Sequence, residues 1–157
     1  ERSIALGLTV EMPDKIMHGS SLGWAGWHQQ ISLWAGNGYL SGLIEQFLAH
    51  DFTVCITADH GNLEAIGTGK ISEGVLAESR GQRTRIYSDQ SLRDITLEEK
   101  KDMTISLNLP ILPESKHALY AKGRGAFVAK GETIVTHGGA SLDEMIVPWI
   151  TIKGGKK

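Results

Sequence analysis

The stretch that decides the fold is Phe52-Thr-Val-Cys-Ile-Thr-Ala58, which leads directly into Asp59-His60-Gly61. Its residues are apolar or β-branched almost without interruption, as is typical of a strand buried on both faces of a sheet. Apolar residues at helical spacing over about 39–50 precede it. A helix followed by a buried strand favours an α/β fold. We therefore expect a mainly parallel sheet sandwiched by helices.

Shorter patterns predict the other elements. Pro13 and Asp14 suit the first turn of a helix, and glycines at 36 and 38 separate a short helix from the helix over 39–50. Ser141 with Glu144 three residues later is typical of a capping box. In chain order we also expect a strand or approach segment over 3–10, a long loop over 61–81, a strand over 83–87, a hairpin formed by 118–122 and 126–130, and a last strand over 148–153.

Composition excludes several classes of protein. The 157 residues carry a formal net charge of -2, so no strong field attracts nucleic acid or an anionic membrane. The longest apolar runs are far too short to span a bilayer. The single cysteine, Cys55, lies within an apolar run, so we expect a buried thiol, no intramolecular disulfide and a cytoplasmic protein.

Three short constellations carry metal-ligand side chains. Asp14 and His18 are four residues apart, which places a carboxylate and an imidazole on one helix face about 6 Å apart along the axis. Asp59 and His60 follow the predicted strand, at the strand end where ligands of α/β sheets gather. His137 precedes a glycine pair that lets the backbone approach closely. Each pattern alone also suits an ordinary turn or helix start, but together they suggest one site for zinc or a similar ion.

These constellations resemble the alkaline phosphatase superfamily, and the fuller strings resemble its PglZ domain. The resemblance runs from about Asp14 to Ile152 and rests on three strings: Ile56-Thr-Ala-Asp-His-Gly-Asn-Leu-Glu-Ala-Ile-Gly67, Arg80-Gly-Gln-Arg-Thr-Arg-Ile-Tyr87 and Thr136-His-Gly-Gly-Ala-Ser-Leu-Asp-Glu-Met-Ile-Val-Pro148. It implies an alkaline phosphatase-like fold and a metal-dependent phosphatase or phosphodiesterase. It also implies two divalent ions, zinc or manganese, and a phosphate-ester or nucleotide-like substrate.

The resemblance assigns the ligands residue by residue. Asp14, His18 and His137 would hold one ion, and Asp59 and His60 would supply half the shell of the second. The remaining ligands and the nucleophile precede the matched part of the family pattern. We therefore expect residues 1–157 to be the carboxy-terminal part of the domain, incomplete by itself, with an apolar surface on which the preceding half docks.

Two further residues are candidates for substrate binding. Arg83, with its neighbours Arg80 and Arg85, could pair with a substrate phosphate, or the three could form a solvated strand edge. Asn62 could hydrogen-bond a ligand carboxylate or simply complete a turn.

PglZ-type proteins are associated with BREX phage-defence gene clusters, so other defence proteins are expected as partners. Two alternatives remain: an interaction module that keeps the fold without chemistry, and a domain with one structural metal ion.

Overall fold

The chain is a mixture of short helices and short strands. The computed structural model describes residues 5–19, 23–72, 77–110 and 112–155, with only the backbone of Gly19, Ser79 and Arg80. In chain order its elements are α1 (Met12–Gly19), α2 (Gly23–Ala35), α3 (Tyr39–Ala49), β1 (Val54–Ile56), β2 (Leu63–Gly67), β3 (Ser79–Arg80), β4 (Thr84–Tyr87), α4 (Gln90–Glu99), β5 (Thr104–Ile105), β6 (His117–Ala121), β7 (Gly125–Ala126), β8 (Thr133–Thr136), α5 (Leu142–Met145) and β9 (Ile150–Ile152). This content agrees with the predicted α/β class.

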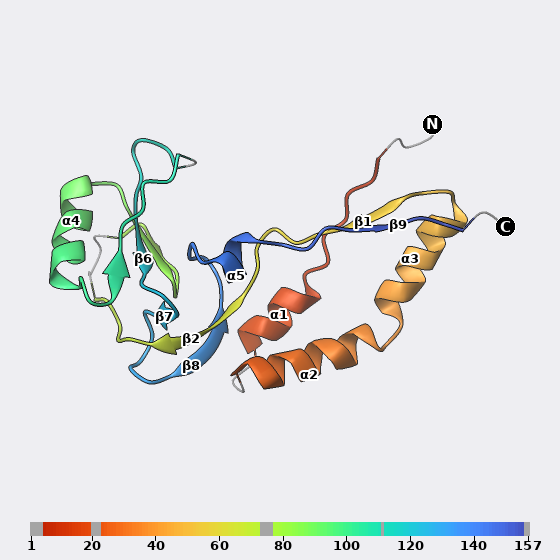
Figure 1. Cartoon of the computed structure of the whole chain (residues 1–157), viewed down its shortest axis with the longest axis horizontal. Coiled ribbons are helices and arrows are strands. Elements are labelled where there is room, and N and C mark those ends of the chain that lie inside the picture. Colours follow the sequence, from red (N-terminus) through yellow and green to blue (C-terminus); the bar gives the residue numbers. More distant parts are fainter. Residues whose placement is uncertain (1–4, 20–22, 73–76, 111, 156–157) are drawn as a thin grey trace.

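Helices α1, α2 and α3 lie on one side of the molecule, and the larger sheets lie on the other side together with α4 (Figure 1). Figure 1 shows α1, α2 and α3 at one side, α4 with β6 and β7 at the other, and the β1–β9 ribbon running past α3. Helices α1 and α2 both contact β8, which joins the two sides. None of the helices in the described part of the chain is long and apolar enough to cross a bilayer.

The prediction of a mainly parallel sheet is wrong for the described strands. These form three small sheets in the orders β1-β9, β7-β2-β8 and β3-β4-β6-β5. Only β2 and β7 pair in parallel, and the other described pairings are antiparallel. A single helix-then-strand unit suggested the parallel sheet. Most of the later strands follow one another without a helical crossover, which parallel pairing needs.

Strand β1 is not the central buried strand that its composition suggested. Among the described strands it pairs only with β9, through Val54↔Ile152, Cys55↔Thr151 and Ile56↔Ile150. Val54 and Ile56 are half-buried and Cys55 is exposed. The predictions of burial on both faces and of a buried thiol are therefore wrong here, because the strand face that carries Cys55 is open to solvent.

Local signals predicted several elements correctly. Helix α1 begins at Met12, the glycines at 36 and 38 separate α2 from α3, and both halves of the capping box are present at the start of α5. Residues 5–10 form neither helix nor strand, and β2 occupies part of the predicted loop over 61–81. The expected hairpin is wrong: β6 pairs with β4 and β5, whereas β7 pairs with β2.

The buried apolar residues form small clusters within the sheets. Leu63, Ala65 and Ala126 make one cluster, and Tyr87, Leu119 and Ala77 make another beside α4. Within α3, every residue of which is described, no residue is buried. Large apolar side chains are exposed along α5 and into β9: Leu142, Met145, Ile146, Trp149 and Ile150. The helical side of the molecule and the β1–β9 ribbon are therefore thinly covered.

Candidate metal centre

Helix α1 presents a carboxylate and an imidazole side by side. Asp14 and His18 lie one turn apart, and the distance from Asp14 Oδ2 to His18 Nε2 is 3.5 Å. Both side chains are about half exposed, at 48% and 58%. Helix α1, with Pro13 in its first turn, thus places two potential ligands on one face, as the spacing predicted.

His137 reaches these two side chains from the loop that follows β8. Its Nε2 lies 3.7 Å from Asp14 Oδ1, and its ring centroid lies 5.6 Å from that of His18. One ligand atom from each of Asp14, His18 and His137 falls within 4.8 Å of the others. Two segments more than a hundred residues apart in the sequence therefore bring together three potential ligands of a single cation.

Asp59 and His60 join the cluster through the His137 ring. The His60 and His137 rings are stacked, with centroids 3.8 Å apart and an interplanar angle of 12°. His60 Nδ1 lies 3.1 Å from the carbonyl oxygen of Gly61, so a proton on Nδ1 would leave Nε2 as the free ligand atom. That Nε2 lies 3.8 Å from Asp59 Oδ1, and the Asp59 side chain is 91% exposed. All five predicted ligand residues thus lie in one neighbourhood.

The surroundings of His137 favour its neutral form. Burial lowers the pKa of His137, and the nearby His60 and His18 imidazoles lower it further. The carboxylates of Asp14 and Asp59 partly offset this change. A neutral imidazole is the form that binds a metal ion.

The donor set fits a divalent transition metal. Imidazole nitrogens and carboxylate oxygens are ligands of zinc and manganese. Three protein ligands from Asp14, His18 and His137 would leave a coordination position open, as in catalytic zinc sites, whereas structural zinc has four protein ligands. These atoms lie farther apart than hydrogen-bonded partners, so no direct bond among them must be broken to admit an ion.

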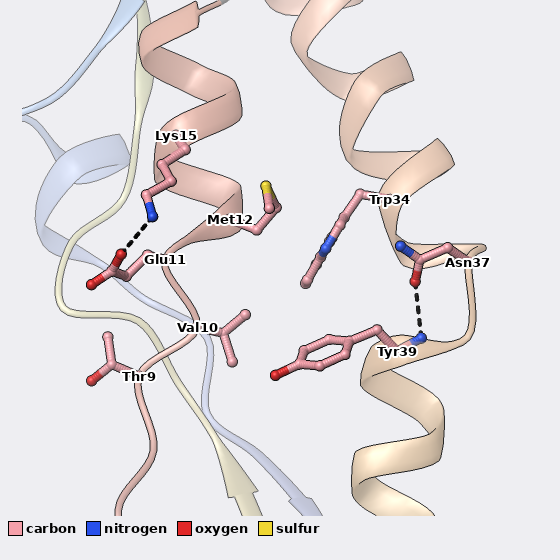
Figure 2. Close-up of a pocket in the computed structure, with 8 residues that line it drawn as sticks. All are labelled: Thr9, Val10, Glu11, Met12, Lys15, Trp34, Asn37 and Tyr39. Atoms are coloured by element: carbon pink, nitrogen blue, oxygen red, sulfur yellow. Dashed lines mark hydrogen bonds and ion pairs between the residues drawn. The ribbon is translucent and has the colours of Figure 1, made fainter.

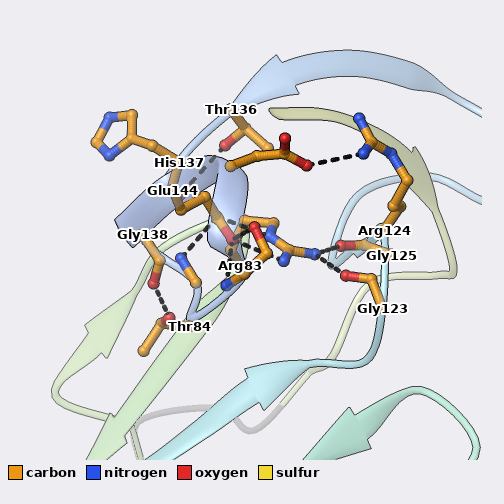
Figure 3. Close-up of polar contacts among 12 residues, drawn as sticks. Arg83, Thr84, Gly123, Arg124, Gly125, Thr136, His137, Gly138 and Glu144 are labelled. Carbon is orange, nitrogen blue, oxygen red and sulfur yellow. Dashed lines mark hydrogen bonds and ion pairs between the residues drawn. The ribbon is translucent and has the colours of Figure 1, made fainter. Parts of the chain in front are cut away.

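Arg83 lies buried rather than at a substrate surface. Its side chain is 1% exposed and forms a two-pronged pair with Glu144, with Nε–Oε1 3.0 Å and Nη2–Oε2 2.9 Å (Figure 3). Its Nη1 donates to the carbonyl oxygens of Gly123 and Gly125. Neither a phosphate contact nor a solvated strand edge describes Arg83 in this arrangement.

The other polar candidates differ in how far the structure buries them. Arg85 is 5% exposed, and its guanidinium lies over the Phe127 ring at 4.9 Å. The side chain of Arg80 lies outside the described part of the chain. Asn62 is half-buried, and its Oδ1 is buried with no hydrogen-bond partner among the described residues.

Sequence reasoning missed the role of Glu144. Burial would raise its pKa, but hydrogen bonds from Arg83, Ser141 and the Gly139 amide, with the Arg83 charge, bring the pKa down to about 2. The capping box pointed to Glu144 as a helix-start residue. No local pattern could identify Arg83, 61 positions away, as its partner.

A separate cavity of about 430 Å³ lies between the chain before α1 and the turn that joins α2 to α3. Figure 2 shows Trp34 and Tyr39 facing Val10 and Met12 across it. None of the five ligand candidates lines this cavity.

A comparison with protein families finds a match over most of the chain. The family model for the BREX system PglZ alkaline phosphatase-like domain matches residues 11–152. No curated protein matches the sequence.

Proposed function

The chain belongs to the PglZ family, the alkaline phosphatase-like domains of BREX systems, and on this basis we propose that it carries part of a metal-dependent phosphatase or phosphodiesterase site. Asp14, His18 and His137 hold the first ion, and Asp59 and His60 contribute to the second. The observation that carries the proposal is the convergence of Asp14, His18 and His137, with ligand atoms within 4.8 Å of one another. The stack of His60 on His137 extends this group toward the second ion.

The roles of the residues follow from their chemistry. A pair of divalent ions, zinc or manganese, would activate the attacking oxygen, stabilise the leaving oxygen and spread the transition-state charge. In this proposal the imidazoles and carboxylates of this chain hold and orient the ions, and Asn62 hydrogen-bonds a ligand carboxylate. The substrate is a phosphate ester, with a nucleotide-like group as one candidate. A cytoplasmic site of action beside other BREX components fits the family.

The nucleophile and the remaining ligands belong, in this proposal, to a preceding half of the domain. Three features support a preceding half that docks on this chain. Helix α3 has no buried residue, β1 and β9 form a sheet of two strands, and large apolar side chains between Leu142 and Ile150 are exposed. A two-stranded ribbon is marginally stable by itself, so further strands or helices are expected on it.

Cys55 offers a test of this docking. Its thiol is exposed on β1, so a thiol reagent should modify it readily in the 157-residue chain and slowly in the full-length protein. Equal rates in the two proteins would contradict docking on this ribbon.

One observation favours a second reading, a domain with a single ion. Among the residues that the structure describes, only Asp14, His18 and His137 converge as a ligand group, whereas Asp59 is largely exposed. Under this reading the ion serves stability, or the fold serves as an interaction module without hydrolysis.

Metal titration and hydrolysis assays on the full-length protein separate these readings. Two Zn²⁺ ions should bind per chain, and a chelator should abolish hydrolysis of a generic phosphodiester, with recovery on adding Zn²⁺ or Mn²⁺. His137→Ala should lower hydrolysis by about 100-fold or more. His50→Ala is the matched control, because His50 follows α3 and is exposed outside the cluster.

A protein that binds no divalent ion would rule out the enzyme reading. One ion without hydrolysis would favour the structural site. Turnover by the 157-residue chain alone would refute the assignment of the nucleophile to the preceding half.

A further inference from the structure

The buried Arg83–Glu144 pair is the most enclosed ionic contact in the described part of the chain. Both side chains are 1% exposed, and two parallel hydrogen bonds join them (Figure 3). The Arg83 guanidinium also donates hydrogen bonds to two carbonyl oxygens, that of Gly123 before β7 and that of Gly125 within β7. Such a pair has a fixed geometry, because any displacement leaves a charge buried without its partner.

The Glu144 carboxylate holds the loop that carries His137. Its oxygens accept hydrogen bonds from the Gly139 amide at 2.8 Å, the Ser141 amide at 3.1 Å and the Ser141 hydroxyl at 2.6 Å. Thr84, next to Arg83, donates its hydroxyl to the carbonyl oxygen of Gly138. The loop therefore lies directly on the ion pair.

Gly139 shows how close this approach is. A Cβ atom at Gly139 would lie 2.6 Å from Glu144 Oε2 and 2.8 Å from Arg83 Nη2, closer than such contacts allow. Both atoms are fixed by their mutual hydrogen bonds, so they have little freedom to move aside.

The backbone of Glu144 holds the loop that carries His60. The Gly61 amide donates to the carbonyl oxygen of Glu144 at 2.8 Å. A Cβ atom at Gly61 would overlap the carbonyl oxygen of Asp143. One residue thus touches both histidine loops, by its carboxylate on one side and by its carbonyl on the other.

We infer that Arg83 and Glu144 are positioning residues of the metal centre: the pair sets the loop of His137 against the loop of His60, so that the two imidazoles are stacked in place before an ion binds. That the site binds a metal ion rests on the proposed function. The placement of the two rings is a property of the metal-free protein. Ligands held in advance by surrounding hydrogen bonds bind an ion more tightly. Loss of the residues that make these hydrogen bonds typically weakens metal affinity about 10–100-fold.

Two variants with matched controls test the inference. Glu144→Gln is compared with Asp143→Asn, which makes the same charge change one residue earlier on α5, in an exposed pair with Arg124. Gly139→Ala leaves the ion pair in place and displaces the loop. Its control is Gly42→Ala in α3, where a Cβ would meet no atom within 4 Å.

Two measurements on the full-length protein decide the outcome. Crystal structures of the metal-free variants should show the His60–His137 stack broken in Glu144→Gln and Gly139→Ala and kept in both controls. Zn²⁺ titration should show Kd raised about 10–100-fold in the two test variants and within about twofold of wild type in the controls.

Several results would overturn the inference. An intact stack in the folded Glu144→Gln protein would do so. If Glu144→Gln does not fold, Gly139→Ala decides, and that variant refutes the inference if it keeps the stack, keeps wild-type affinity, or also fails to fold. Wild-type protein that binds no Zn²⁺ but shows a stack that depends on Glu144 would refute the proposed function and leave the loop positioning intact.

Discussion

The stability of this chain should depend on the charge of Glu144 in acidic solution, below a pH of about 4.5. Folding lowers the pKa of the Glu144 carboxyl from its ordinary value of 4.5 to about 2. At about 1.4 kcal/mol per unit, the ionised carboxylate contributes about 3 kcal/mol to the free energy of unfolding at neutral pH.

The direction of the pH effect follows from the sign of the pKa shift. The pKa is lowered by folding, so the contribution is fully present above pH 4.5 and is lost as the pH falls through about 2. It should fall to roughly 1 kcal/mol at pH 3 and below that at pH 2.

Urea unfolding, followed by tryptophan fluorescence from pH 7 to pH 2, measures this contribution. Wild type is compared with Glu144→Gln at each pH, so that other carboxylates cancel. At pH 7 the variant should be less stable by about 3–5 kcal/mol, because Arg83 is left buried without its ionic partner. This difference should shrink steadily in acid.

A difference that stays constant between pH 7 and pH 3 would refute the reasoning. Carboxyl ¹³C NMR of Glu144 gives an independent check, and a folded-state pKa near 4.5 would contradict the geometry. Asp143→Asn should change stability by no more than about 1 kcal/mol, since its pair with Arg124 is exposed.

Three further outcomes follow from the same contacts. Ser141→Ala should lower the free energy of unfolding by about 1–2 kcal/mol, because it removes the capping hydroxyl of α5 and a hydrogen bond to Glu144. Chemical denaturation measures this change, and an unchanged free energy of unfolding would contradict the capping box. Gly61→Ala should cost about 1–3 kcal/mol or more through its overlap with Asp143, measured by thermal unfolding and refuted by wild-type stability. Gly42→Ala should be neutral or stabilising by up to about 1 kcal/mol in the same assay, and a clear loss of stability would mean that α3 packs more tightly than described.

The local part of this fold could be predicted from the sequence because local signals act over a few residues. Pro13 and Asp14 lie in the first turn of α1, the glycines at 36 and 38 lie between α2 and α3, and Ser141 with Glu144 caps α5. The assignment to the PglZ family, made from the strings around His60, Arg83 and His137, is confirmed by the family match.

The strand partners could not be predicted in this way. The apolar run around Cys55 predicted a strand buried between parallel neighbours, whereas its one partner among the described strands is the antiparallel β9. An apolar run indicates that a strand tends to be buried, but the rest of the fold determines which elements cover it.

For the candidate site, the sequence determined which side chains are available and the tertiary structure determined what they meet. Spacing placed Asp14 beside His18, since both lie on one helix face. The stack of His60 on His137 and the ion pair of Arg83 with Glu144 join residues 77 and 61 positions apart, so no periodic pattern encodes them. The ion pair forms because the folded chain shields Arg83 and Glu144 from water, so each side chain needs the other as its partner. This requirement exists only once the sheets and α5 have packed together.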